Sequence, residues 1–430
     1  MNWIFFLLVG VAFAVAAVRE LGHVPVDDTP SPMAALSSGV IDAAGGAVEL
    51  ALGLVGVMTL FLGLMKVAEA GGLLVIIARL IRPLMVRLFP DVPPEHPAMG
   101  AMILNFSANG LGLGNAATPF GIRAMQELDK LNPHPGTATN SMALFLAINT
   151  SSVTLLPTGV IALRAAAGSD DPAGILPTTL FATLCATLAA ITAAMVYKRF
   201  APVPGATSSP PIDRPWVEEH SSPANHVEQH GAYPTWVSVV ALCGLVALIP
   251  ASIIWGRLIS PWIIPGLIVS FLLFGLLRGV RIYEVFVDGA REGFQVALRI
   301  IPYLVAILVA VGMFRASGAM EITVSAIGGV TGRFGLPAEV LPMALLRPLS
   351  GSGAYGIMAS IINDPTIGPD SYIGYLVTTL QGSTETTFYV LAVYFGAVQI
   401  RRIRHTLAAA LTADVVAVIA AVAICRWLFL

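Results

Sequence analysis

Charge is scarce in this chain. Charged residues make up 11% of its 430 residues, whereas a soluble domain carries about 25%. Hydrophobic residues account for 56% of the sequence, and the mean hydropathy is +0.82. This balance excludes an ordinary soluble domain and predicts a polytopic protein of the lipid bilayer. The net charge of −2 leaves nothing to indicate binding of nucleic acid.

Cysteines and catalytic motifs are scarce as well. Cys185, Cys243 and Cys425 each lie alone in an apolar run, without the spacing of a metal site. The sequence has no GxSxG, no HExxH and no phosphate-binding GxxxxGK loop, and no histidine falls in an expected spanning segment. We therefore expect no enzyme and no cofactor.

What the chain does contain is a repeat. Asp42–Ala51 aligns with Asp288–Ala297 at an offset of 246, and the polar run Asn149–Thr154 aligns with Gln381–Thr386 at an offset of 232. Internal repeats are typical of membrane transporters, in which the ligand site lies where the repeats meet. The fold expected is all-α, with two inverted repeats that each hold a re-entrant helical hairpin and a partly unwound transmembrane helix.

Apolar runs of about 20 residues predict the spanning helices. They lie at 2–18, 43–65, 138–165, 174–197, 235–254, 259–277, 285–314, 372–396 and 406–428. The expected parts are an N-terminal helix and external loop (1–37), a first repeat (38–200), a polar cytoplasmic linker (201–233), and a second repeat with two leading helices (234–430).

Two other pairs of segments differ from ordinary spans. Gly72–Phe89 carries Arg79, Arg82 and Arg87 on about one helical face, which predicts a helix at the membrane surface, and Gly318–Phe334 is its counterpart. Pro97–Glu127 and Pro342–Ile362 are apolar but interrupted by glycines and small polar residues. Such a break cannot face lipid, because unpaired backbone groups cost several kcal/mol there, so these pairs predict the hairpins.

The polar residues of the two unwound helices and the two hairpin tips form the expected binding site for a small polar solute. Runs of five or six polar residues cover every face of a helix, so burial against one neighbour does not explain them. The alternative is that single Ser and Thr side chains bond back to their own helix. The predicted substrate-binding residues are Asn105, Ser107, Asn109, Asn115, Asn149, Thr150, Ser151, Ser152, Arg347, Ser350, Ser352, Gln381, Ser383, Thr384, Glu385 and Thr386.

Among these residues, Glu385 gives the strongest indication of a functional role. A carboxylate near the middle of a spanning segment costs about 2.5–3.5 kcal/mol or more, so a function and a partner are expected. It could coordinate Na⁺, carry H⁺ or bind the solute, so the coupling ion stays open between Na⁺ and H⁺. The alternative is a structural ion pair with Arg347, at the mouth of the second hairpin.

Positive charge orients the chain. Lys198-Arg199 ends the last helix of the first half, whereas Arg401-Arg402 precedes the last helix of the second half. Since short cytoplasmic loops attract Lys and Arg, the two halves are predicted to be inverted, with a cytoplasmic N-terminus and an external C-terminus. The expected location is the bacterial cytoplasmic (inner) membrane, and a homo-oligomer is a further expectation.

Longer motifs carry a resemblance. Phe89–Met102, Gly112–Gly121 and Ile148–Thr154 closely resemble the spore maturation protein A family, while Arg347–Gly353 and Gly382–Gly396 resemble the spore maturation protein B family. The chain resembles a fusion of the two, and both groups belong to the nucleoside-recognition (Gate) domain family. That family is similar to parts of concentrative nucleoside transporters, which implies an elevator-type fold with two hairpins and two unwound helices around an ion-coupled site.

Two classes of function follow from the sequence. The first is a secondary transporter of a small polar solute, nucleoside-like or a small organic anion, coupled to Na⁺ or H⁺. The second is a non-transporting membrane factor for spore maturation or envelope assembly, whose polar patches bind a partner or lipid. An envelope enzyme that uses Glu385 is a weaker third reading.

Overall fold

The computed structural model describes residues 2–23, 30–112, 114–151, 153–201, 233–320, 322 and 331–430. Within these ranges the chain is all-α, and its one β-type contact is an isolated bridge between Thr137 and Arg402. Most of the linker expected at 201–233 lies outside the described residues, as does most of the surface helix expected at 318–334.

The first half contains eight helices among its described residues. They are α1 (Asn2–Leu21), α2 (Pro32–Ala70), α3 (Leu73–Leu88), α4 (Pro97–Gly110), α5 (Gly114–Lys130), α6 (Asn140–Thr150), α7 (Thr158–Ala166) and α8 (Leu176–Tyr197). Polar side chains cap the N-termini of two of these helices. The Ser31 side chain accepts a hydrogen bond from the Ala34 amide at the start of α2, where Pro32 is the first helical residue, and the Thr139 side chain accepts one from the Met142 amide at the start of α6.

The second half repeats this plan. Its elements are α10 (Thr235–Leu277), α11 (Ile282–Ala316), η1 (Gly332–Phe334), η2 (Ala338–Val340), α13 (Leu341–Leu346), α14 (Gly351–Ile362), α15 (Tyr372–Ser383), α16 (Thr387–Ala397) and α17 (Thr406–Phe429). In both halves a long helix precedes a hairpin, then a helix broken in its middle, then a last apolar helix.

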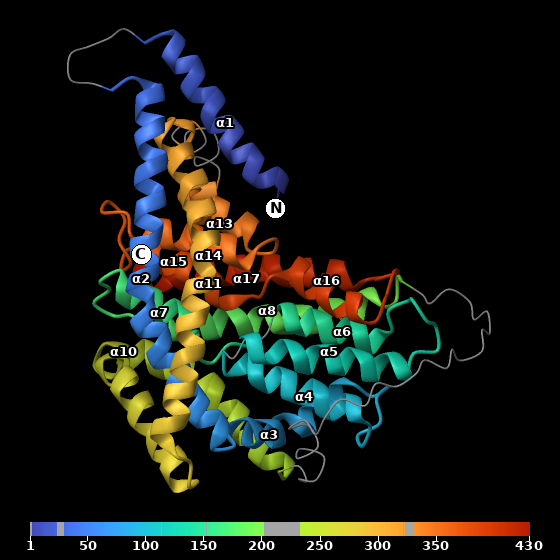
Figure 1. Cartoon of the computed structure of the whole chain (residues 1–430). Helices are drawn as coiled ribbons and strands as arrows, with labels where there is room; N and C mark the ends of the chain where they lie inside the picture. The colour runs from blue at the N-terminus through green and yellow to red at the C-terminus, as the bar shows by residue number, and fades with distance from the viewer. Residues whose placement is uncertain are drawn as a thin grey trace.

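Two long helices form one side of the molecule. In Figure 1, α2 and α11 run side by side along their length, with α1 leaning against their upper end. Gly312 packs against Ala43 at one end, and Gly289 packs against Lys66 at the other, so the two helices are antiparallel. Glycine allows the two helices to approach this closely, because a Cβ atom at position 289 would lie only 2.5 Å from the Cβ atom of Lys66.

The hairpins and broken helices form the other side. Figure 1 shows α4, α5, α6, α8, α16 and α17 as a stack that projects from the long pair. The last helices of the two halves pack antiparallel, because Tyr197 at the end of α8 lies 3.1 Å from Thr412 near the start of α17. Buried Ala, Met, Leu and Phe side chains fill this stack.

The lengths of the spans differ from the prediction. Among the described residues, α8 and α17 are long and apolar enough to cross a membrane, and Met58–Ala70 with Leu73–Leu88, bent by 68°, makes a third if counted as one span. The helices expected at 235–254 and 259–277 are one continuous helix, α10. The prediction of two helices was wrong because it divided the apolar stretch into runs of about 20 residues, and one interior glycine such as Gly256 costs a helix only about 1 kcal/mol.

The amphipathic segment after α2 agrees with the sequence. Gly72, with a φ of 87°, ends α2 and lets α3 start in a new direction with Arg79, Arg82 and Arg87 along it. Arg82 bonds to Glu95 at 3.2 Å, and Arg79 lies 4.4 Å above the ring of Tyr233. The separate helix is confirmed, and its place at a membrane surface stays a prediction.

Candidate functional site

Four interruptions of helix lie at the centre of the site. Tip 1 (111–113) separates α4 from α5, and tip 2 (347–350) separates α13 from α14. Break 1 (151–157) separates α6 from α7, and break 2 (384–386) separates α15 from α16. The two hairpins and the two unwound helices therefore occur where the polar runs predicted them.

Backbone hydrogen bonds join these four segments. The Leu155 amide of break 1 donates to the Gly110 carbonyl beside tip 1 at 2.9 Å. Just after break 2, the Phe388 amide donates to the Pro348 carbonyl of tip 2 at 3.0 Å. Each tip is thus bound to the broken helix of its own half. Such pairing satisfies backbone groups that would otherwise be costly in a dry interior.

Two cavities open between the four segments. The larger cavity has a volume of about 570 Å³ and is lined by Asn109, Thr118, Asn149, Leu349, Ser350, Gly351, Ser352, Glu385, Thr386, Tyr389, Val390 and Tyr394. The smaller, of about 240 Å³, is lined mainly by Asn109, by Thr154, Leu156 and Pro157 of break 1, by Thr158, Gly159 and Val160 of α7, and by Arg347, Tyr355, Gln381, Thr384, Glu385 and Thr386. Asn109, Glu385 and Thr386 line both cavities.

A pair of asparagines connects tip 1 to break 1. The Asn109 amide nitrogen donates to the Asn149 side-chain oxygen at 2.9 Å, and the Asn149 nitrogen donates to the Phe145 carbonyl at 3.0 Å. Asn149 is buried, whereas Asn109 is half-buried. Among the described residues the side-chain oxygen of Asn109 accepts no hydrogen bond, and Asn109 lines both cavities, so this oxygen is an available acceptor there.

Asn105 lies next to the site but lines neither cavity. Its amide nitrogen donates to the Ala117 carbonyl at 2.8 Å and to the Tyr394 hydroxyl at 3.2 Å. It thereby closes the first hairpin and fixes it to α16 of the other half. The side-chain oxygen of Asn105 is buried and has no partner in the protein.

Arg347 binds break 2 instead of Glu385. Its guanidinium donates to the Thr384 carbonyl and, at 3.2 Å, to the Thr386 hydroxyl. Arg347 and Glu385 form no ion pair within 4.0 Å, although they are close enough for their charges to interact. The structural ion pair considered from the sequence is therefore absent, and the carboxylate of Glu385 faces the two cavities.

Several predicted residues do not reach the cavities. The hydroxyls of Ser107, Thr150, Ser151 and Ser383 donate to carbonyls of their own helices, at Ile103, Ala147, Ala147 and Leu380. These four predictions are not supported by the structure, because each side chain points back along its helix as Ser and Thr do in apolar surroundings. Ser152 and the side chain of Asn115 lie outside the described residues.

The remaining predictions come together. Ser350, Ser352 and Thr386 line the larger cavity, where the Ser350 oxygen also caps α14 by accepting from the Gly353 amide at 3.1 Å. Arg347, Gln381 and Thr384 line the smaller cavity. The Gln381 side-chain oxygen is buried without a partner in the protein.

Two residues of the site, and a third that lies close to break 2, were missed from the sequence. Tyr389 and Tyr394 line the larger cavity from α16, but aromatics in an apolar run look like ordinary core. Asp414 is buried in α17 and accepts a bond of 2.7 Å from the Thr387 hydroxyl, directly after break 2. A lone carboxylate inside the apolar run 406–428 was the signal that could have found it.

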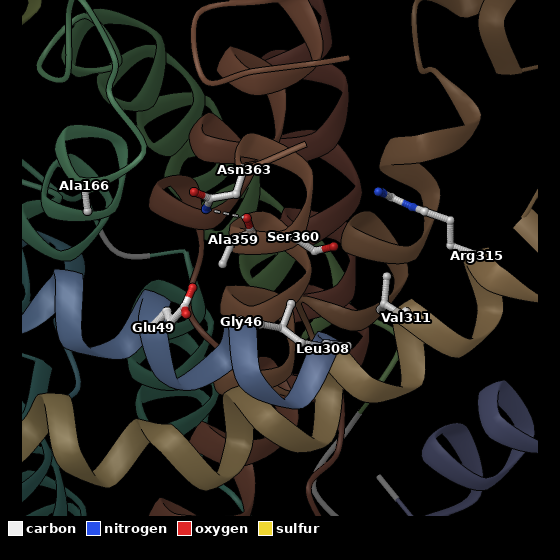
Figure 2. A pocket seen from close by; sticks show the side chains of 11 residues that line it. Gly46, Glu49, Ala166, Leu308, Val311, Arg315, Ala359, Ser360 and Asn363 are labelled. Carbon is white, nitrogen blue, oxygen red and sulfur yellow. Dashed lines mark hydrogen bonds between the residues drawn. The ribbon is translucent and has the colours of Figure 1, made fainter. Parts of the chain in front are cut away.

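Another cavity lies away from the breaks. Figure 2 shows this space of about 470 Å³, lined by residues of α2, α7, α11 and the end of α14, with Glu49, Asn363 and Arg315 around it. The Asn363 amide nitrogen donates to the Ala359 carbonyl at 2.8 Å, and Arg315 pairs with Asp364 at 2.7 Å. None of the predicted site residues lines it.

Metal binding through a cluster of side chains finds no candidate in the described ranges, where no group of three or more His, Cys, Asp or Glu residues could hold an ion. A cation near Glu385 would instead depend on hydroxyls and carbonyls of break 2 and tip 2.

Comparison with known proteins gives three likenesses. The chain is 46% identical over 166 residues to spore maturation protein B of Bacillus subtilis (strain 168), a match that covers 39% of this chain and 92% of that protein. It is 48% identical over 156 residues to spore maturation protein A of the same organism, which covers 36% of this chain and 80% of that protein. Each relative covers part of the chain, as a fusion of the two requires.

The third likeness is to a solved structure, the Alcanivorax borkumensis YdaH transporter, at 15% identity and a TM-score of 0.39 over 98% of this chain and 97% of that one. The family profile for nucleoside recognition (Gate) matches residues 51–167 and 297–401, just over half of the chain. Because this profile matches just over half of it, the chain belongs to the nucleoside recognition (Gate) family.

Proposed function

We propose that this chain is a secondary transporter of a small polar solute, coupled to Na⁺ or H⁺. The observation that carries the proposal is the convergence of four helix interruptions on two polar cavities. A volume of about 570 Å³ falls within the range of about 300–1,000 Å³ that is usual for small-molecule sites. Non-helical backbone at membrane depth is tolerated where it is buried or lines such a cavity.

The side chains favour recognition by hydrogen bonds. Asn109, Asn149, Ser350 and Ser352 are neutral donors and acceptors, and Tyr389 adds an aromatic face. A nucleoside-like solute fits this combination and the description of the family. A small organic anion is less favoured, because Arg347 already uses two of its donor groups on break 2.

Glu385 is the residue that we assign to ion coupling. Its carboxylate lines both cavities and has no ion pair among the described residues, while its amide joins break 2 to break 1. Binding of Na⁺ or H⁺ at Glu385 would neutralise a carboxylate in a poorly solvated place. Transport by an elevator movement of the hairpin side against α2 and α11 is part of the same proposal.

The proposed setting is the bacterial cytoplasmic membrane, with 38–200 and 234–430 as inverted repeats, a cytoplasmic N-terminus and an external C-terminus. The antiparallel packing of α2 on α11 and of α8 on α17 supports this arrangement. A reporter that fluoresces only in the cytoplasm, fused after Leu430, should stay dark. The expected homo-oligomer is testable by light scattering of the purified protein.

A non-transporting role in envelope or spore assembly is the second candidate. The names of the two relatives support it, because both are spore maturation proteins. In that case the polar tips would bind a partner or lipid in place of a transported solute.

Thermal stabilisation of the purified full-length protein distinguishes the two. Adenosine, uridine, succinate and glycine are each tested with and without Na⁺, since a ligand at 100 times its Kd adds about 2.7 kcal/mol to the folded state. We expect one solute class to raise the melting temperature of the wild type but not of Asn149→Ala. Equal melting temperatures with every solute, together with stabilisation by lipid alone, would favour the assembly role.

A further inference from the structure

Asp414 is a buried carboxylate that the proposed solute site does not use. It lies in the middle of α17, is 6% exposed, and has the small apolar residues Ala410, Ala413 and Ala417 on its own helix. One of its oxygens accepts a bond of 2.7 Å from Thr387, and the other is buried without a partner in the protein. An ionised carboxylate with a single hydrogen bond is costly in such a place.

The charge that faces Asp414 is Arg347. No ion pair joins them within 4.0 Å, yet Arg347 is the charged group whose field acts on Asp414. The helices packed against α17 are α6, which has no titratable side chain, and α8, α15 and α16, whose titratable residues are Cys185, Tyr197, Tyr372, Tyr375, Tyr389 and Tyr394. None of these side chains is a cation, so Arg347 is the positive charge that can stabilise an anion at Asp414, in addition to the hydrogen bond from Thr387.

Arg347 and Asp414 hold opposite sides of break 2. Arg347 binds the Thr384 carbonyl and the Thr386 hydroxyl, while Asp414 accepts from Thr387, the first residue of α16. Arg347 cannot keep both of these bonds and also move into contact with Asp414, because its guanidinium is a rigid fork. The protonation of Asp414 and the attachment of Arg347 to break 2 are therefore linked.

We propose that Asp414 is a proton-binding site of the chain. Its protonation state controls whether Arg347 keeps its hydrogen bonds to Thr384 and Thr386 of break 2. This inference rests on the proposed transport function and assigns H⁺ as a coupling ion. Protonated Asp414 is neutral and leaves Arg347 on Thr384 and Thr386, as the structure has it. When the carboxyl releases its proton to water, the remaining carboxylate attracts Arg347 away from break 2, which loosens the cavity wall that Thr384 and Thr386 form.

The surroundings favour a proton over Na⁺ at this position. Asp414 lines neither cavity, and its one hydrogen-bonding partner in the described part of the chain is the Thr387 hydroxyl. Hard cations such as Ca²⁺ and Mg²⁺ take about six or more oxygen ligands, and Na⁺ shares their preference for oxygen. One carboxylate and one hydroxyl are too few ligands for a metal ion, but they are sufficient to bind a proton.

The test is infrared difference spectroscopy of the purified full-length protein in lipid vesicles, titrated with acid and base. We expect the carbonyl stretch of a protonated carboxylic acid to appear as the pH is lowered, and to be missing in Asp414→Asn. Thr387→Val removes the hydrogen bond that favours the ionised form, so the band should persist to higher pH in that variant. Thr412→Val, on the same helix but bonded to Ala408 and Tyr197, is the matched control and should leave the band unchanged.

A wild-type spectrum whose carboxylic acid band is identical to that of Asp414→Asn would overturn the proposal. So would loss of the band on addition of Na⁺ at constant pH, since Na⁺ would then compete for Asp414. The experiment needs no solute, so its failure is separate from that of the transport function. If uridine or another probe binds but Asp414 stays ionised throughout the titration, the proposed solute site is supported and the proposed proton site is refuted.

Discussion

The backbone amide of Glu385 donates a hydrogen bond of 2.8 Å to the carbonyl of Thr150. Thr150 is the last residue of α6 and Glu385 lies in the middle of break 2, so this bond joins the broken helices of the two halves directly. Because each broken helix is also bonded to its own hairpin, a change at one tip can reach the other through three backbone bonds. The solute site is therefore one connected unit built by both repeats.

Replacement of Asn109 by Ala should weaken solute binding. The substitution removes an acceptor that faces both cavities and leaves the oxygen of Asn149 without its donor. Loss of about 1.4 kcal/mol corresponds to a tenfold higher Kd, a typical effect for one hydrogen bond to a buried partner. Equilibrium binding of the solute found in the stabilisation screen measures it.

Ser383→Ala is the matched control for that variant. Its hydroxyl bonds to Leu380 and lines neither cavity, although it lies next to break 2. We expect an unchanged Kd. A larger loss of affinity in Ser383→Ala than in Asn109→Ala would mean that the cavities described are not where the solute binds.

Arg164→Leu should strongly destabilise the fold. Arg164 is fully buried, pairs with Asp370 at 2.8 Å, donates to the Pro369 carbonyl at 2.7 Å and stacks on Tyr375 at 4.1 Å. It thus fixes the end of α7 to the start of α15. Since Asp370 is 34% exposed, we expect a loss of about 3 kcal/mol, the lower end for a broken buried pair.

Chemical denaturation of the purified protein measures this loss. Arg291→Leu is the control, because its pair with Asp288 at 3.4 Å is exposed on both sides and should contribute almost nothing. Similar unfolding curves for the two variants would refute the structural role of Arg164.

Gly121→Ala should separate the first hairpin from α16. A Cβ at Gly121 would lie within 2.5 Å of the Tyr394 ring and hydroxyl, and 2.9 Å from the Asn105 nitrogen. Overpacking of this kind costs about 1–3 kcal/mol. Gly396→Ala, where a new Cβ meets nothing within 4 Å, should instead be neutral or slightly stabilising. Melting temperatures check both, and tolerance of Gly121→Ala would contradict the packing described.

Asp364 should give a small dependence of stability on pH. Burial acts to raise the pKa of Asp364, but hydrogen bonds from Thr366 and the charge of Arg315 outweigh it, so that pKa lies below its ordinary value of 3.8. The stabilisation is present above this value and is lost as the pH falls through the lowered pKa. Asp364→Asn should lower the melting temperature at neutral pH, and the difference from wild type should disappear in acid. A constant difference would contradict this.

Much of the architecture could be predicted from the sequence. Polar runs such as Asn149–Thr154, in which Val153 is the one apolar residue, have no helical face that can be hidden, so they indicated the breaks in the right places. Glycine-rich interruptions likewise indicated both hairpins. That α10 is one continuous helix was not predictable, because Pro250, Gly256 and Pro261 each suggest an interruption that the helix does not make.

The roles of single site residues were harder to predict. Successive helical residues differ in direction by about 100°, so whether Ser383 or Thr386 faces the cavity depends on where the helix ends, and that is set by Arg347 binding Thr384. Arg164 meets Pro369 and Asp370 about 200 residues away, which no local pattern encodes. Asp414 was visible as a lone carboxylate in α17, but its partner Thr387 was not.

Uptake into proteoliposomes tests the central claim most directly. Vesicles that hold the wild type or Glu385→Gln receive a radiolabelled form of the solute that stabilises the protein, with an imposed gradient of Na⁺ or of H⁺. The account predicts accumulation of the solute against its gradient by the wild type with one of these ions, and loss of that accumulation in Glu385→Gln. Binding without any uptake by the wild type under either gradient would contradict transport.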